Sequence, residues 1–398
     1  MTRTVVSSVF CAIVLIGGLI LARVVYERSR QLGPIVNRPV VESAEPVAAG
    51  GTISPAAAVR PSPTPAPVAN AKTPPVAPGP ASRPAMAPTP TPPLASSQPG
   101  EKNKLPLAYV ADGTFGGGSV TKLSGIAIDA NRNLLVLGSD HDVVVVNMKS
   151  GDQVQRFDTG REVLSIGVAG DGAIFVGEVG QAEKYRRLDK GNYVLDFALA
   201  DGMMTVTAVH PVGGEIVCAN AAGRQLVRFN ASGKPLKKQI PSTQLELGKP
   251  AAGTLLVPND TLDFAANLKG QGVVVCHPGE HRVEGYTLDG KRQWFWGRFD
   301  ERAVEGFSGC CNPVNVAVFP LDKLARPDLA GRGLGIVTAE KGPARVKVYD
   351  QKGKLLAVID ESNFNADNRH MYLAVDDQCR IYVADTEANT VRRFKVKS

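Results

Sequence analysis

Two adjacent cysteines are the residues whose type and spacing point most directly to chemistry. Cys310 and Cys311 stand in the segment Phe307-Ser-Gly-Cys-Cys-Asn-Pro313. Adjacent cysteines can close into a strained vicinal disulfide, which is easily reduced, or remain as thiols that react or bind a metal or ligand. The structural alternative is a tight turn, in which Asn312 and its neighbours reverse the chain and the cysteines pack.

The other cysteines are scattered. Cys11 lies in an apolar run near the N-terminus, and Cys379 lies between two short apolar runs. Cys218 and Cys276 end apolar runs and are expected to be small buried residues. The chain has no C-x-x-C pair, so the sequence does not predict a zinc ribbon or a thioredoxin-type site.

The elements that must position the cysteines form a repeat. An apolar run, a turn and a second apolar run recur six times, most clearly from Gly125-Ile-Ala-Ile-Asp129 and from Leu373-Ala-Val-Asp376. The copies start near Ile126, Ile166, Thr207, Phe264, Val316 and Leu373. Repeats of this length that are built of short strands are typical of a propeller.

Each copy continues into a third strand, an Asp/Asn-Gly-Lys type turn and a fourth strand. Asp289-Gly-Lys291 and Asn230-Ala-Ser-Gly-Lys234 are two of these turns. One four-stranded sheet cannot bury both faces alone, so we expect six sheets to stack around an axis. The sequence therefore predicts an all-β, six-bladed β-propeller over residues 105–398.

The last repeat stops before its fourth strand. An unassigned strand-like piece, residues 105–111, precedes the first repeat. We expect it to complete the last sheet, because closure by the chain ends removes an exposed strand edge. The alternative is that residues 105–111 are linker.

Propeller topology gathers certain loops on one face. These are the loops from the second to the third strand of each sheet and the loops that lead from one sheet to the next. The candidate binding residues on this face are His141, Glu178, His277, Glu340, Lys341, His370, Asp385, Cys310, Cys311 and Asn312. Carboxylates and imidazoles converging on an axial funnel could hold a divalent metal for a hydrolase or lyase reaction. No catalytic residue is assigned, because no G-x-S-x-G, H-E-x-x-H or Walker sequence occurs.

The last repeat supports a resemblance. The run from Ile381-Tyr-Val-Ala-Asp385 to Phe394 resembles the NHL-repeat pattern, in which Val-Ala-Asp ends a strand before a polar turn. Middle repeats depart from it, with Val217-Cys-Ala-Asn220, Val275-Cys-His277 and Thr338-Ala-Glu340. The resemblance implies a six-bladed propeller that binds partners, and some similar propellers are metal-dependent lyases or lactone hydrolases.

The first 104 residues differ from the rest. Residues 5–25 are apolar and long enough to span a bilayer, so residues 1–31 are predicted to be an N-terminal membrane anchor; a cleaved signal peptide is the alternative. Residues 32–104 hold 18 of the 29 prolines and are predicted to be a disordered spacer of polyproline II character.

Charge follows the same division. Residues 1–104 contain ten Lys/Arg and four Asp/Glu, whereas the remaining 294 residues contain 35 and 34. The nearly neutral propeller gives no case for nucleic acid, and the basic tail is suited to lipid headgroups.

Two arguments about orientation oppose each other. Basic residues after the apolar run favour a cytoplasmic propeller. The plan of one anchor, a Pro-rich spacer and a propeller favours a single-pass inner-membrane protein with an extracytoplasmic, periplasmic propeller. We expect the second arrangement, with the propeller binding a protein or small ligand. A metal-dependent enzyme and a redox-linked propeller that uses Cys310 and Cys311 are the alternatives.

Overall fold

The computed structural model describes residues 105–241 and 255–397. The predicted anchor and spacer therefore lie outside the described residues. Within the described ranges the chain is all-β: it forms 22 strands, four short 3-10 helices and no α-helix. None of these described elements is a helix long and apolar enough to cross a membrane.

Four of the five sheets are four-stranded and antiparallel. One sheet consists of β2 (Leu123–Asp129), β3 (Leu134–Ser139), β4 (Asp142–Asn147) and β5 (Gln153–Asp158). A second consists of β12 (Phe264–Ala266), β13 (Gly272–His277), β14 (Arg282–Thr287) and β15 (Arg292–Trp296). A third consists of β16 (Asn315–Pro320), β17 (Leu334–Glu340), β18 (Arg345–Asp350) and β19 (Leu355–Ile359).

The remaining four-stranded sheet joins the two ends of the described chain. It consists of β1 (Tyr109–Phe115), β22 (Thr390–Val396), β21 (Ile381–Asp385) and β20 (Leu373–Val375). The 3-10 helices are η1 (Pro278–Glu280), η2 (Leu321–Leu324), η3 (Pro327–Leu329) and η4 (Glu361–Asn363).

The fifth sheet has six strands and covers two of the predicted repeats. It consists of β6 (Ser165–Val168), β7 (Ile174–Gly177), β8 (Val179–Arg187), β9 (Tyr193–Val212), β10 (Glu215–Asn220) and β11 (Gln225–Asn230). The 20-residue β9 pairs with β8 through its first part and with β10 through its second. The two repeats thus share one strand where two separate strands were predicted.

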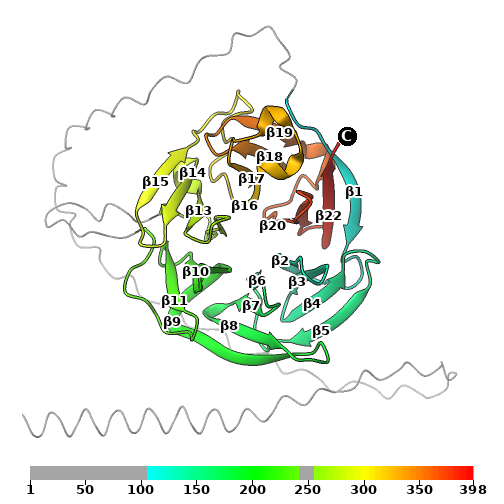
Figure 1. Ribbon diagram of the computed structural model, residues 1–398, viewed down its shortest axis with the longest axis vertical. Coiled ribbons are helices and arrows are strands. Elements are labelled where there is room, and N and C mark those ends of the chain that lie inside the picture. Colours follow the sequence, from blue (N-terminus) through cyan, green and yellow to red (C-terminus); the bar gives the residue numbers. More distant parts are fainter. Residues whose placement is uncertain (1–104, 242–254, 398) are drawn as a thin grey trace, which may run out of the picture. The chain divides into compact units, whose positions relative to one another are not determined.

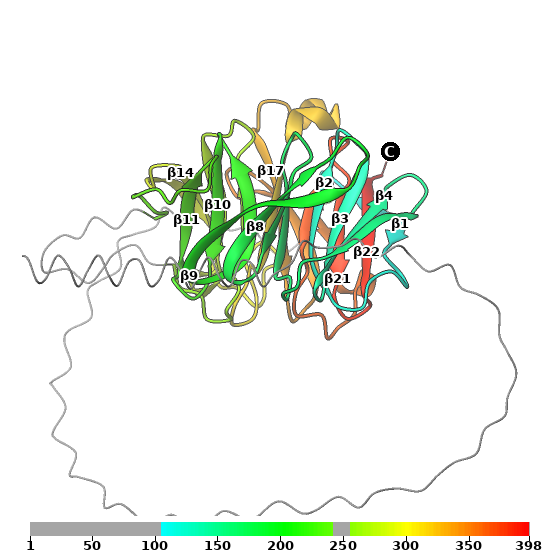
Figure 2. The ribbon, with the colours of Figure 1, turned by 90° about the horizontal axis from the view of Figure 1, so that it is seen from below.

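The sheets follow one another around a ring, with the first and last strands side by side (Figure 1). Seen from the side, their strands run up and down next to one another (Figure 2). This arrangement is propeller-like, as the repeats predict.

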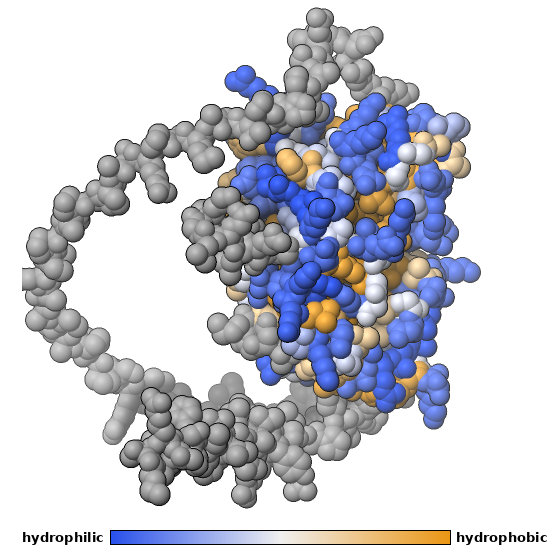
Figure 3. Space-filling view, turned by 60° about the vertical axis from the view of Figure 1, so that its left-hand side comes forward, coloured by the Kyte–Doolittle hydropathy of each residue, from blue (hydrophilic) through white to orange (hydrophobic). Residues whose placement is uncertain are grey.

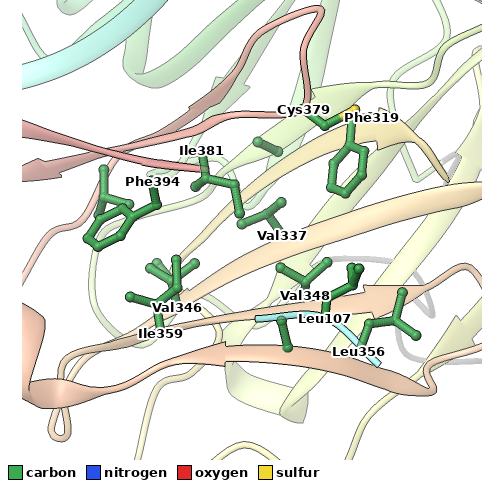
Figure 4. Packing of buried hydrophobic residues seen from close by; sticks show 14 of the residues in the cluster. Leu107, Phe319, Val337, Val346, Val348, Leu356, Ile359, Cys379, Ile381 and Phe394 are labelled. Carbon is green, nitrogen blue, oxygen red and sulfur yellow. The ribbon is translucent and has the colours of Figure 1, made fainter. Parts of the chain in front are cut away.

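Apolar side chains fill the spaces between neighbouring sheets. Six buried clusters lie between successive groups of strands. One of them joins β2–β4 to β20–β22 and so links the beginning of the ring to its end. Figure 4 shows one cluster, in which Val337 and Val348 of one sheet face Ile381 and Phe394 of the next. Burial of such side chains contributes about 1.5–3 kcal/mol each, so contact between sheets is the main stabilising term.

The chain ends close the last sheet, but with a strand later than the predicted residues 105–111. β1 spans Tyr109–Phe115 and pairs with β22 from Tyr109↔Val396 to Phe115↔Val391. Pro106 has no N–H to donate, which disfavours pairing further upstream. The strand continues through a register shift between Ala111 and Gly113.

The expected fourth strand after β11 is not formed among the described residues. Only two isolated bridges, Leu226↔Ile240 and Phe229↔Pro235, lie there. Pro235 and Pro241 lack the N–H groups that a regular ladder requires.

Candidate functional site

The residues that end the second strands are buried polar groups that hold the incoming chain. Four of them accept a backbone N–H from the segment that leads into their own repeat. These bonds join Thr121 N to Ser139 Oγ (3.1 Å), Thr205 N to Asn220 Oδ1 (3.2 Å), Leu256 N to His277 Nε2 (2.8 Å) and Ser308 N to Glu340 Oε1 (3.3 Å). Of the candidate binding residues, His277 and Glu340 therefore have a structural role.

Three of the sheets add a side-chain pair whose members are seven residues apart and include at least one carboxylate. His277 Nδ1 lies 2.9 Å from Glu284 Oε1, Glu340 Oε1 lies 3.0 Å from Lys347 Nζ, and Asp385 Oδ2 lies 3.2 Å from Arg392 Nη2. In each pair the first residue ends the second strand and the other lies on the third. Each pair gives a buried carboxylate a hydrogen-bonding partner that it would otherwise lack.

His277 has a defined tautomer in this arrangement. Its Nε2 accepts the N–H of Leu256, so the proton of the neutral ring must sit on Nδ1 and point to Glu284. Both ring nitrogens are occupied, and the side chain is buried. His277 consequently fixes the chain and leaves no lone pair for a metal ion.

Glu178 differs from these residues because its buried carboxylate is incompletely paired. The residue is fully buried; Oε2 accepts from Gln181 Nε2 at 3.2 Å, and Oε1 has no partner. Burial, and then the nearby carboxylate of Glu183, raise the pKa of Glu178 to about 7. Arg161 lies 3.7 Å from Oε2 and opposes this shift only weakly.

The raised pKa makes Glu178 a source of pH-dependent stability. Because the folded carboxyl holds its proton more tightly than the unfolded chain does, its contribution is present below pH 4.5 and is lost as the pH rises through about 7. Glu178→Gln should therefore increase the free energy of unfolding by about 1–3 kcal/mol at pH 8 and change it little at pH 4.5. Denaturant titration at both pH values measures this. The exposed Glu162→Gln is the matched control, and equal gains at both pH values would contradict the prediction.

The predicted cysteine pair lies in a loop that enters β16; we call residues 307–313 the cysteine loop. Cys310 is exposed and Cys311 is buried, and their sulfur atoms lie 3.2 Å apart. No disulfide joins them: the Cys311 thiol donates to Cys310 Sγ. Burial and this contact raise the pKa of Cys311, and Lys341 opposes the shift. The pair thus presents one solvent-accessible sulfur, that of Cys310, and one buried sulfur, that of Cys311.

Asn312 fastens the cysteine loop to the end of β17. Its Nδ2 donates to the backbone oxygens of Ser308 and Lys341, and its Oδ1 accepts the N–H of Lys341 at 2.9 Å. Asn312 is fully buried. Asn312 thus makes the contacts expected of the structural alternative, and it also holds Lys341 beside the cysteines.

A buried ion pair supports the loop from beneath. Lys347 donates to Glu340 Oε1 and to the backbone oxygen of Gly306, and both charged side chains are fully buried. Arg345 bonds Glu340 Oε2 and also donates to Ser308 Oγ at 3.0 Å. Burial lowers the pKa of Lys347 to about 8 despite the nearby carboxylate. The loop is thereby held by charged hydrogen bonds, which are stronger than neutral ones.

Sequence reasoning missed Lys347, Arg345 and Ser308. The signal that could have identified the first is a lysine inside the apolar strand Val346-Lys-Val-Tyr349, seven residues after Glu340. A lysine within a buried strand needs a carboxylate partner, and the end of the preceding strand supplies it.

Two histidines adjoin the cysteine loop. His370 lies near Lys341, which together with burial lowers the pKa of His370; its Nδ1 is buried without a partner. His281 contacts the exposed ring of Phe299 with ring centroids 5.0 Å apart, and burial lowers the pKa of His281 as well. Two imidazoles with lowered pKa values, the Lys341 cation and the Phe299 ring therefore lie near the cysteine loop.

The structure brings together only part of the predicted site. Cys310, Cys311, Asn312, Glu340 and Lys341 form one group, which His370 adjoins. His141, Glu178, His277 and Asp385 each bond within their own repeat, and the exposed His141 contacts Asp140 Oδ2 at 3.0 Å. Among the residues that the structure describes, no group of three or more His, Cys, Asp or Glu could hold a metal ion.

Comparisons with known proteins assign no relationship: no protein-family model and no curated protein matches the chain.

Proposed function

We propose that the protein is a membrane-tethered, extracytoplasmic binding module that contacts a protein or small ligand through the cysteine loop. The observation that carries this proposal is an exposed thiol on a loop held by buried charged groups. Binding sites need such support, because a contact group held in place loses little entropy on binding. Lys341, which bonds Asn312, and Phe299, which pairs with Phe307, add a cation and an apolar ring to this loop.

The architecture that we propose is a six-bladed, NHL-like propeller. Counting the six-stranded sheet as two blades that share β9 gives six, and six apolar clusters between successive strand groups support that count. The apolar run at residues 5–25 supports a bilayer anchor, and the Pro-rich residues 32–104 support a spacer that keeps the module away from the membrane surface.

A redox-linked role of the same loop is the second candidate. The sulfur atoms of Cys310 and Cys311 lie 3.2 Å apart, so a shift of about 1 Å would bring them to the length of a disulfide bond. Oxidation would remove one hydrogen from each thiol and pass two electrons to a thiol–disulfide partner, which is reduced in turn.

Photo-crosslinking from Cys310 tests the binding proposal. Among the described cysteines only Cys310 is exposed, so a thiol-directed crosslinker on the native-membrane protein should react there. We expect one discrete crosslinked species. The control Cys310→Ser/Lys291→Cys carries the crosslinker on the β14–β15 turn and should not give that species. Equal products from both positions, or none from Cys310, would contradict a specific contact at the loop.

A further inference from the structure

The two thiols of the cysteine loop differ in what can reach them. Cys310 is exposed and Cys311 is buried, although they are neighbours in the chain. Burial also raises the pKa of Cys311, so this thiol keeps its proton while the pair is at rest. Because a thiolate, and not a thiol, attacks a disulfide, access and ionisation both disfavour Cys311 as the first attacking group. The first attack on another molecule is therefore left to Cys310.

The fixed geometry of the loop gives Cys311 a second role. Its thiol donates to Cys310 Sγ across 3.2 Å. Gly309 has a φ of +73°, and a Cβ atom there would lie 3.3 Å from Gly342 O, so the start of the loop packs closely on the neighbouring backbone. Asn312 anchors the other end. Once Cys310 is joined to another sulfur, Cys311 already lies beside the bond that must break.

We propose that this pair reduces a disulfide of a partner molecule by thiol–disulfide exchange, with Cys310 as the attacking thiol and Cys311 as the resolving thiol. The inference rests on the proposed contact through the cysteine loop, and it names the substrate and the residue roles of the redox candidate.

The exchange takes place in two balanced steps. Cys310 loses its proton to solvent and attacks one sulfur of the partner disulfide; a mixed disulfide forms, the partner bond breaks, and the released thiolate takes up a proton. Cys311 then loses its proton and attacks Cys310 Sγ. The mixed disulfide breaks, the second partner sulfur leaves as a thiol, and Cys310 and Cys311 are joined. Two electrons and two protons have passed to the partner.

Strain in the product limits the class of disulfide that can be reduced. Adjacent cysteines close into a strained ring, and a strained disulfide is itself easily reduced. The pair can therefore pass electrons only to a disulfide that accepts them more readily. Exposed or strained disulfides meet this condition, whereas structural disulfides resist reduction. The substrate that we propose is an exposed, labile disulfide.

The surface that leads to the loop suits a brief encounter with such a partner. β15 precedes the cysteine loop in the chain, and the side of the ring that carries β15 shows hydrophobic patches between hydrophilic side chains (Figure 3). Non-obligate interfaces have this mixed character, and redox partners form small, weak contacts. A partner that delivers a disulfide to Cys310 and leaves after its reduction needs no larger apolar surface.

Reaction with 5,5′-dithiobis(2-nitrobenzoate), a labile aromatic disulfide, tests the roles of the two thiols. The parent is the reduced full-length protein in detergent with Cys11→Ser, which removes the cysteine outside the described residues. It should release about two nitrothiobenzoate ions per chain and end two hydrogens lighter, without an adduct. Adding Cys311→Ser should release one ion and leave one adduct on Cys310. Adding Cys310→Ser should abolish release until denaturant is present. The matched control Cys379→Ser, at another buried cysteine, should behave as the parent.

Oxidised dithiothreitol, a stable cyclic disulfide, tests the substrate class and should leave the parent in its dithiol form. A parent that releases one ion and keeps one adduct would show that Cys311 does not resolve the mixed disulfide; the exchange would then be wrong, while the binding proposal would stand. Reaction of the Cys310→Ser variant at the parent rate would overturn the assigned roles. Closure of the pair by oxidised dithiothreitol would overturn the substrate class. Conversely, two ions released by a protein that gives no photo-crosslink from Cys310 would contradict the binding proposal and support the exchange.

Discussion

Deletion of residues 105–115 should unfold the propeller-like domain at ambient temperature. The deletion removes the strand that pairs with β22, exposes the edge of β22, and takes Phe115 and Leu107 out of two apolar clusters. It also leaves Arg393 without Asp112, whose Oδ2 lies 3.0 Å from the guanidinium. Loss of one buried aromatic ring alone costs about 3–5 kcal/mol, against a typical domain stability of about 5–15 kcal/mol.

Circular dichroism and thermal melting of the variant measure this effect. Deletion of residues 40–80 is the control, since it removes a longer segment from the predicted spacer and leaves the described fold intact. A cooperative transition with the wild-type midpoint in the 105–115 deletion would show that the ring does not need its first strand.

Glu340→Ala should lower the free energy of unfolding by about 3–5 kcal/mol, because it leaves the ammonium of Lys347 buried without a counter-charge. It also removes the acceptors of Arg345 and of Ser308 N, so the cysteine loop loses support from beneath. Cys311 should then react with thiol reagents at a rate closer to that of Cys310. Denaturant titration and alkylation followed by mass spectrometry check the two effects.

Two further variants separate charge burial from packing. Glu340→Leu/Lys347→Met removes both charges at similar volume and should recover most of the lost stability. Lys323→Met, on an exposed lysine, should be neutral. A Glu340→Ala variant as stable as wild type would mean that the ion pair does not hold the loop.

The fold was more predictable than the site, for a physical reason. Strand periodicity and turn residues are local, so the repeat was visible in single segments such as Ile381–Asp385. The shared strand β9 and the missing strand after β11 depend on pairing between distant segments. Pro235 weakens this pairing locally, but its presence in the sequence does not predict that the strand is absent. Closure by the chain ends was predicted from residues 105–111, whereas the strand that pairs with β22 is Tyr109–Phe115 and continues through a register shift at Asp112.

At the site, topology predicted which loops share a face but could not show what each side chain does there. His277, Glu340 and Asp385 were expected to point at a ligand, and instead they pair with Glu284, Lys347 and Arg392 on the next strand. Whether a polar side chain faces solvent or a partner seven residues later depends on the twist and packing of the sheet. The cysteine pair could be identified from sequence because two consecutive cysteines bring their sulfur atoms close together in any fold.

Labelling of Cys310 with a membrane-impermeant maleimide on sealed, right-side-out membrane vesicles tests the central claim most directly. The claim is that an exposed thiol on a tethered module faces away from the cytoplasm. We expect, after mild reduction with an impermeant reductant, one label per chain before detergent is added, and no label in Cys310→Ser. Labelling that requires detergent would place the module on the cytoplasmic side, and labelling that requires denaturation would show that the cysteine loop offers no accessible sulfur.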